Sequence, residues 1–150
     1  MNTVVNILAA IFAASWRTVL TGAFFCGLQT VLEHIASPAP NWIIDLSLKG
    51  LFNAAVGLLG GFLLCAWLAP VIVVPAVVVM GPAGYFGLKY NQNFAPWQLS
   101  VLGFAFGFLI WLLLFHHVRT MPRVASAFFC GGIPGAVAGY YFAKTMIARS

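Results

Sequence analysis

Long apolar runs separated by short polar segments are the feature that most constrains this chain. The polar segments lie near residues 36–50, 89–98 and 116–123, and the apolar runs between them are about 20 residues long or longer. A helix needs roughly 20 apolar residues to cross the hydrocarbon core of a bilayer. The sequence therefore predicts an all-α, polytopic membrane bundle of four to five transmembrane helices, folded as a single transmembrane domain over residues 1–150.

The scarcity of charge supports the same prediction. The chain is 63% apolar and 6% charged, whereas a soluble domain is roughly 45–50% apolar and about 25% charged. Seven Lys and Arg residues outnumber two acids, but they stand singly at the ends of apolar runs. This spacing is typical of side chains that reach toward lipid headgroups. Because the basic stripe that binds nucleic acid is missing, we expect the lipid bilayer as a partner and no nucleic acid.

The predicted spans are residues 16–35, 51–69, 71–90, 98–117 and 124–147. Residues 3–15 form a possible interfacial helix because Arg17 interrupts the first apolar run, and a single tilted helix is the alternative. Glycine and proline break a helix at membrane depth unless protein or water satisfies the freed backbone groups. Residues 71–90 are therefore predicted to be either a kinked span or a re-entrant segment. The broken-helix candidates are Pro75, Gly81, Pro82, Gly84, Gly87 and Pro134.

An internal duplication is a further hypothesis. Residues 56–63 read VGLLGGFL and residues 102–109 read LGFAFGFL. In both halves a smooth span precedes a glycine- and proline-containing span that ends in aromatic residues and a lysine. A duplication predicts two hairpins of the same orientation, with a transporter-like site at their interface. Chance similarity is the alternative, because Gly, Phe and Leu are abundant throughout the chain.

Glycines four residues apart are the strongest positive signal. Such a pair lies on one helix face, where the missing side chains let two backbones approach closely in lipid. The glycines could pack helices within the chain, or the last three could face another subunit. The predicted helix-packing residues are Gly57, Gly61, Gly103, Gly107, Gly131, Gly135 and Gly139.

Four polar residues of the first span are candidates for a function inside the membrane: Arg17, Gln29, Glu33 and His34. Polar and ionisable residues are rare at membrane depth and often mark functional sites. Gln29 and Glu33 share a helix face, where Glu33 could bind a proton or a cation. The alternative places Glu33 and His34 in the headgroup zone and makes Arg17, beside Trp16, an interfacial anchor.

Catalytic and metal chemistry find little support in the sequence. Cys26, Cys65 and Cys130 each lie inside an apolar run, which predicts small buried side chains rather than ligands. His116 and His117 are adjacent, and neighbouring residues on a helix point about 100° apart, so they rarely bind one ion together. Two acids in the whole chain cannot supply several convergent titratable groups. We expect no catalytic residues, no metal and no cofactor.

These patterns predict a small non-enzymatic integral membrane subunit that packs through glycine faces. The predicted setting is a homo-oligomer or a larger complex with other membrane subunits, engaged in transport or translocation in the bacterial inner (cytoplasmic) membrane. Two alternatives stay open: a holin-like pore former, and an accessory, immunity or exclusion protein that binds another membrane protein.

Overall fold

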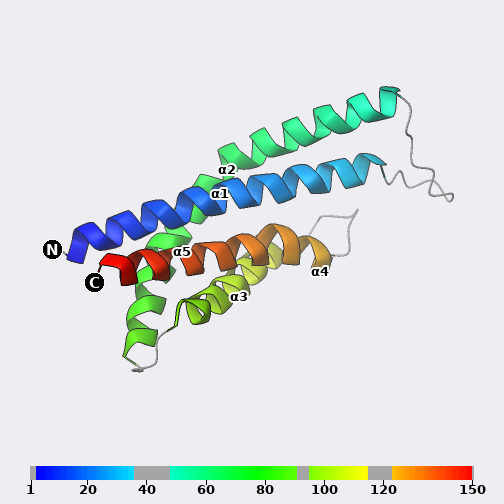
Figure 1. The fold of residues 1–150 in the computed structure, drawn as a ribbon. Coiled ribbons are helices and arrows are strands. Elements are labelled where there is room, and N and C mark those ends of the chain that lie inside the picture. Colours follow the sequence, from blue (N-terminus) through cyan, green and yellow to red (C-terminus); the bar gives the residue numbers. More distant parts are fainter. Residues whose placement is uncertain (1–2, 36–47, 91–94, 115–122, 150) are drawn as a thin grey trace.

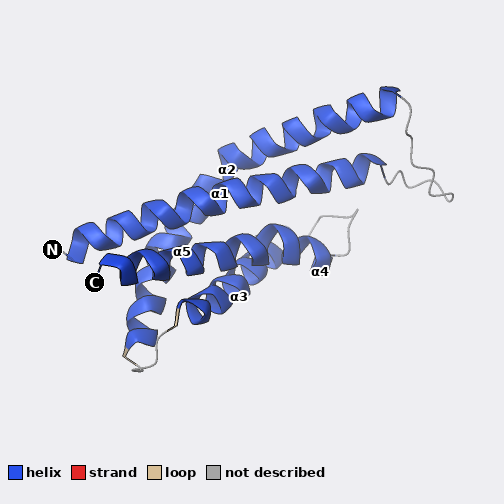
Figure 2. Ribbon diagram, in the orientation of Figure 1, coloured by secondary structure: helices blue, strands red, loops and turns tan. Residues whose placement is uncertain are grey.

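The computed structural model describes residues 3–35, 48–90, 95–114 and 123–149, and every element in these ranges is a helix (Figures 1 and 2). The elements are α1 (Thr3–Ile35), α2 (Leu48–Lys89), α3 (Pro96–Leu114), α4 (Arg123–Ser126), the π-helix η1 (Ala127–Gly132) and α5 (Ile133–Arg149). Because α4, η1 and α5 follow one another without a gap, they form one rod.

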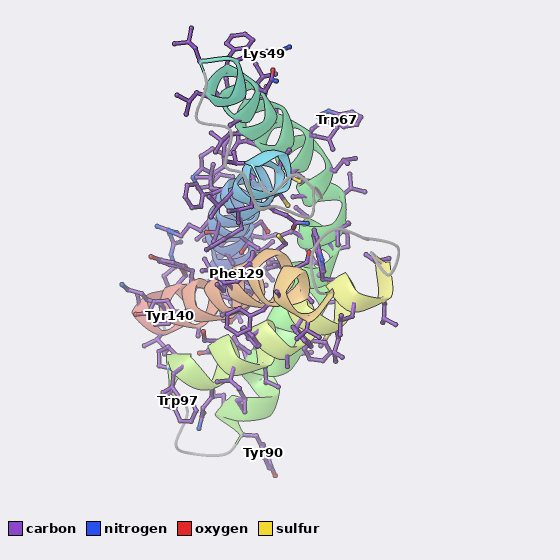
Figure 3. All side chains as sticks on the ribbon, turned by 90° about the vertical axis from the view of Figure 1, so that its right-hand side faces the viewer. Lys49, Trp67, Tyr90, Trp97, Phe129 and Tyr140 are labelled. Carbon is purple, nitrogen blue, oxygen red and sulfur yellow. The ribbon has the colours of Figure 1, made fainter. Side chains whose placement is uncertain are left out.

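Four helical segments are long and apolar enough to cross a membrane: Thr3–Leu32, Leu48–Lys89, Pro96–Leu114 and Val124–Arg149. The predicted all-α membrane bundle is confirmed, with four long helices, and the chain is an integral membrane protein. Large apolar side chains are exposed along these helices, as lipid contact requires. Trp67 is 79% exposed, and Figure 3 shows it pointing away from the bundle.

Helix α1 is one continuous helix of 33 residues. The alternative of a single long helix therefore matches the structure better than an interfacial helix that ends before Arg17. At 1.5 Å per residue, α1 is about 50 Å long, which exceeds the roughly 30 Å hydrocarbon core. A helix of this length crosses the core with residues to spare.

Helix α2 differs from the prediction, which placed a helix end between residues 69 and 71. The structure has a single helix of 42 residues with Pro70, Pro75 and Pro82 inside it. Each proline removes one backbone hydrogen bond and bends the helix. A break would free four N–H and four C=O groups, and no water in the hydrocarbon core could satisfy them. A bent continuous helix therefore replaces the two predicted spans.

The bend in α2 is visible in Figure 1, where its first part runs beside α1 and its last part turns behind α1 and α5 toward the start of α3. Because residues 48–89 form no hairpin, the two similar hairpins predicted from an internal duplication are not present. Residues 71–89 are the second part of a kinked helix, which is one of the two predicted alternatives.

The largest cluster of buried side chains lies where this last part of α2 meets the other helices. Tyr85 and Phe142 are its largest members, with ring centroids 6.3 Å apart. Its other buried residues are Ala10, Ala14, Val77, Leu99, Ala143 and Met146. The two ends of the described chain meet beyond it, because the Asn6 side-chain amide donates to the Arg149 carbonyl oxygen at 2.9 Å.

The π-helix η1 has a cause in the sequence. Pro134 has no backbone N–H, so it cannot donate to the Cys130 carbonyl as an α-helix requires. One residue earlier, the Ile133 N–H donates to the Phe128 carbonyl, which is the wider spacing of a π-helix. The helix thus absorbs the proline by widening one turn before it, and α5 continues to Arg149.

Candidate functional site

The closest helix contact joins α3 to η1 and α5 through glycines from both sides. A Cβ atom at Gly103 would overlap the Gly135 carbonyl oxygen and lie 2.9 Å from its carbon. A Cβ atom at Gly107 would overlap the Gly131 carbonyl oxygen in the same way. One turn further along, Gly139 packs against the Leu99 backbone. We call this contact the glycine seam, and its five glycines are among those predicted to pack helices.

The seam lies inside the chain. Of the two interpretations left open by the sequence, packing within the chain is the one that the structure places here. Gly131 and Gly139 are buried, and their glycine face is occupied by α3. The face is therefore not available to another subunit in this arrangement.

The first glycine pair makes a looser contact between α1 and α2. A Cβ atom at Gly61 would overlap the Thr30 side chain and lie 3.3 Å from the Gly27 Cα atom. A Cβ atom at Gly27 would lie 2.9 Å from the Leu58 carbonyl oxygen. Gly57, the other predicted member, is half-buried. Gly27 was not predicted, and no second glycine four residues away marks it in the sequence.

The broken-helix candidates take different positions. A Cβ atom at Gly81 would lie 2.7 Å from the Phe142 ring. A Cβ atom at Gly84 would lie 2.6 Å from a Leu99 methyl group. These two glycines hold the last part of α2 against α5 and α3. Pro134 is buried and faces Gly22 of α1, while the remaining candidates are exposed or half-buried. The exposed or half-buried candidates are Pro75, Pro82 and Gly87.

Gln29 is the predicted polar residue that enters the bundle. Its side-chain oxygen accepts hydrogen bonds from the Ser126 hydroxyl and the Cys130 thiol, both at 3.1 Å. Ser126, 1% exposed, in turn accepts one from the Trp111 indole N–H at 3.0 Å. Arg17 lies elsewhere, on the exposed side of α1, with its guanidinium over the Tyr141 ring.

Glu33 and His34 belong to the last turn of α1, and their side chains lie outside the described part of the structure. The suggested pairing of Gln29 with Glu33 on one face is therefore neither supported nor opposed. Two hydrogen bonds to Gln29 come from Ser126 and Cys130, which no pattern in the sequence selects.

All three cysteines meet beside Gln29. Cys26 lies within hydrogen-bonding reach of both Cys65 and Cys130, and all three are free thiols. Together with Gln29, Ser126 and Trp111 they connect every long helix of the bundle. We call these six residues the polar thread. Their spacing in sequence does not reveal it, because each membrane helix supplies only one or two members.

An apolar cavity of about 280 Å³ lies beside the polar thread. Its walls come from α1, α2, α3 and the η1–α5 rod. The α2 wall runs from Leu64 to Gly84, and the α3 wall runs from Leu99 to Leu114. The three cysteines and Trp111 supply part of its lining. The cavity exists because α2 bends away from α3, and the described parts of the two helices make few contacts, among them that of Gly84 with Leu99.

The polar thread places three thiols, an amide, a hydroxyl and an indole beside the apolar cavity. Among the described residues, no group of three His, Cys, Asp or Glu side chains could hold a metal ion. Comparison with protein families, curated proteins and solved structures found no match to this chain. Its function is therefore inferred from its own geometry.

Proposed function

We propose that this chain is a non-enzymatic membrane subunit of a transport or translocation complex, and that side chains from a transmembrane helix of a partner subunit fill its apolar cavity. The observation that carries the proposal is the cavity between α2 and the α3–α5 pair. A single chain that worked alone would be expected to close such a gap with its own side chains, because protein interiors are close-packed.

The length of the cavity favours a helix as its occupant. Its walls extend over 21 residues of α2, from Leu64 to Gly84, and over 16 residues of α3, from Leu99 to Leu114. At 1.5 Å per residue these walls are about 30 Å and about 22 Å long, close to the thickness of the hydrocarbon core. Small residues along the walls, such as Gly22, Ala69 and Ala76, would let a second backbone approach closely.

The apolar lining favours a subunit over a pore. Water and ions need polar groups along their route, whereas the cavity is lined almost entirely by apolar atoms. The polar residues of α1 and α3 do not gather on one face, which a holin-like pore would need after oligomerisation. Any solute route would therefore belong to the partner or to a surface shared with it.

The test is purification from native membranes in mild detergent, followed by mass measurement of the intact assembly. The expected result is a second membrane protein in a fixed ratio to this chain. Ala69→Trp fills the cavity and should lower recovery of the partner at least tenfold. Ala55→Trp is the matched control, because Ala55 lies on the exposed side of the same helix and outside the cavity.

Three results would contradict the proposal. Recovery of this chain alone would remove the partner, and recovery of several copies would make the occupant a second copy of the chain. An ion leak from liposomes that contain only this chain, unchanged by Ala69→Trp, would favour the pore former.

A further inference from the structure

On the outer side of α1 and α5, two neighbouring tyrosine rings each contact a cationic side chain. The Arg17 guanidinium carbon lies 4.2 Å from the Tyr141 ring centroid. The Tyr141 and Tyr140 rings meet edge to face, with centroids 5.4 Å apart. The Lys144 ammonium lies 5.9 Å from the Tyr140 ring centroid. Figure 3 shows Tyr140 at the outer edge of the molecule, far from Lys49 and Trp67.

Both cations lack a carboxylate partner among the described residues. The Arg17 side chain has five N–H donors, and one of its nitrogens donates to the Ala13 carbonyl at 3.2 Å. No other described residue accepts from it. The chain has only two acids, and one of them, Glu33, is 16 residues further along α1, about 24 Å away at helical rise. An unpaired cation in a membrane protein favours an anion from outside the chain.

The depth of these cations along the bundle suggests the source of that anion. From Arg17 to Ile35, α1 extends over 18 residues or about 27 Å, which is close to one hydrocarbon thickness. The start of α3 lies at the same level, because Gly139 of α5 packs against Leu99. Trp16, beside Arg17, is 58% exposed. Exposed tryptophan and tyrosine side chains are typical of the headgroup level.

We propose that Arg17, Tyr140, Tyr141 and Lys144 form a binding site for the phosphate of an anionic phospholipid. The planar guanidinium donates two parallel hydrogen bonds to phosphate, and the lysine adds a point charge. The two tyrosines hold the cations in place through their ring faces. The site is separate from the cavity, because none of its four residues lines the cavity. It also does not depend on the proposed partner helix.

The experiment is native mass spectrometry of the purified chain with phosphatidylglycerol or phosphatidylcholine of identical acyl chains. The wild-type chain should retain phosphatidylglycerol about 25-fold better, at about fivefold for each of the two cations. Lys144→Gln should lower this preference about fivefold, and Arg17→Gln with Lys144→Gln about 25-fold, given about 1 kcal/mol per basic residue near an anionic surface. Lys49→Gln is the matched control and should leave the preference unchanged, because Lys49 is in the first turn of α2, which Figure 1 shows at the opposite end of the bundle from the end of α5.

Lys144→Gln keeps the test decisive if Arg17→Gln prevents folding, because Lys144 is exposed. Equal retention of the two lipids would overturn the proposal, as would equal effects of Lys144→Gln and Lys49→Gln. Displacement of the lipid by excess inorganic phosphate would assign the site to free phosphate instead.

Discussion

The glycine seam and the α2 side of the cavity lie in the same bundle but are packed in different ways. In the seam, glycines of α3 and of the η1–α5 rod meet backbone to backbone, with Gly103 against Gly135 and Gly107 against Gly131. On the α2 side, Gly61 meets the Thr30 side chain and Gly27. Beyond that contact α2 bends away and leaves a cavity of about 280 Å³.

The difference shows that the spacing of glycines on one helix does not determine how closely two helices approach. Gly61 and Gly103 each belong to a glycine pair of four-residue spacing, but Gly61 meets the Thr30 side chain and Gly27, whereas Gly103 meets the Gly135 backbone. Close approach in lipid requires small residues on both partners. At the α1–α2 contact the Thr30 side chain stands against Gly61 and fills the space that the missing glycine side chain leaves.

The largest expected effect comes from adding one methyl group to the seam. Gly103→Ala places a Cβ atom where the Gly135 carbonyl oxygen lies, and neither backbone can move without parting the helices. We expect the free energy of unfolding to fall by about 2–3 kcal/mol, measured by detergent-induced unfolding in mixed micelles.

Gly60→Ala is the control, because nothing lies within 4 Å of a Cβ atom there. It should raise stability by about 0.5–1 kcal/mol through higher helix propensity. Equal effects of the two variants would show that the seam is not close-packed.

A smaller effect is expected from the polar thread, which joins the two sides of the comparison. Gln29→Leu leaves the Ser126 hydroxyl and the Cys130 thiol without their shared acceptor. We expect the free energy of unfolding to fall by about 1 kcal/mol, near the range measured for hydrogen bonds between membrane helices.

The control is Thr145→Val, because the Thr145 hydroxyl bonds only within its own helix, to the Tyr141 carbonyl at 2.8 Å. The double variant Gln29→Leu with Ser126→Ala should cost less than the sum of the two single changes, because they share one bond. Simple additivity would argue against the thread.

The smallest effect is expected at the cavity, where there is room to add atoms. Ala76 lines the cavity and is half-buried, so Ala76→Leu should change the free energy of unfolding by no more than about 0.5 kcal/mol. Ala127→Leu is the matched change in a filled part of the bundle. Ala127 is fully buried, and its replacement should cost about 1–3 kcal/mol through overpacking. If the same unfolding measurement gave equal losses for both variants, the α2 side would be as tightly packed as the seam.

The sequence predicted the helical membrane fold because hydrophobic run length is a property of single segments. It also selected the seam glycines, because their four-residue spacing is local. The end of the helix before Pro70 was predicted wrongly, since proline ends a helix readily in water but only bends it where a break would leave backbone groups unsatisfied.

The polar thread and the cavity could not be predicted, because they depend on which helix lies beside which. Cys26, Cys65 and Cys130 are distant in sequence, and each alone resembles a small buried apolar residue. Gly61 faces Gly27, which has no local pattern of its own. Such contacts follow from the bend of α2 and from the π-helix before Pro134, which are properties of the assembled bundle.

The hydrogen bond from Asn6 to the Arg149 carbonyl has a consequence for how the polypeptide is threaded through the membrane. It fastens the first turns of α1 to the last turn of α5, and Figure 1 shows these two extremities next to each other. An even number of crossings brings both tails into one compartment, whereas five crossings would separate them. Reporter enzymes fused in turn to either tail should therefore be active on the same side of the bilayer.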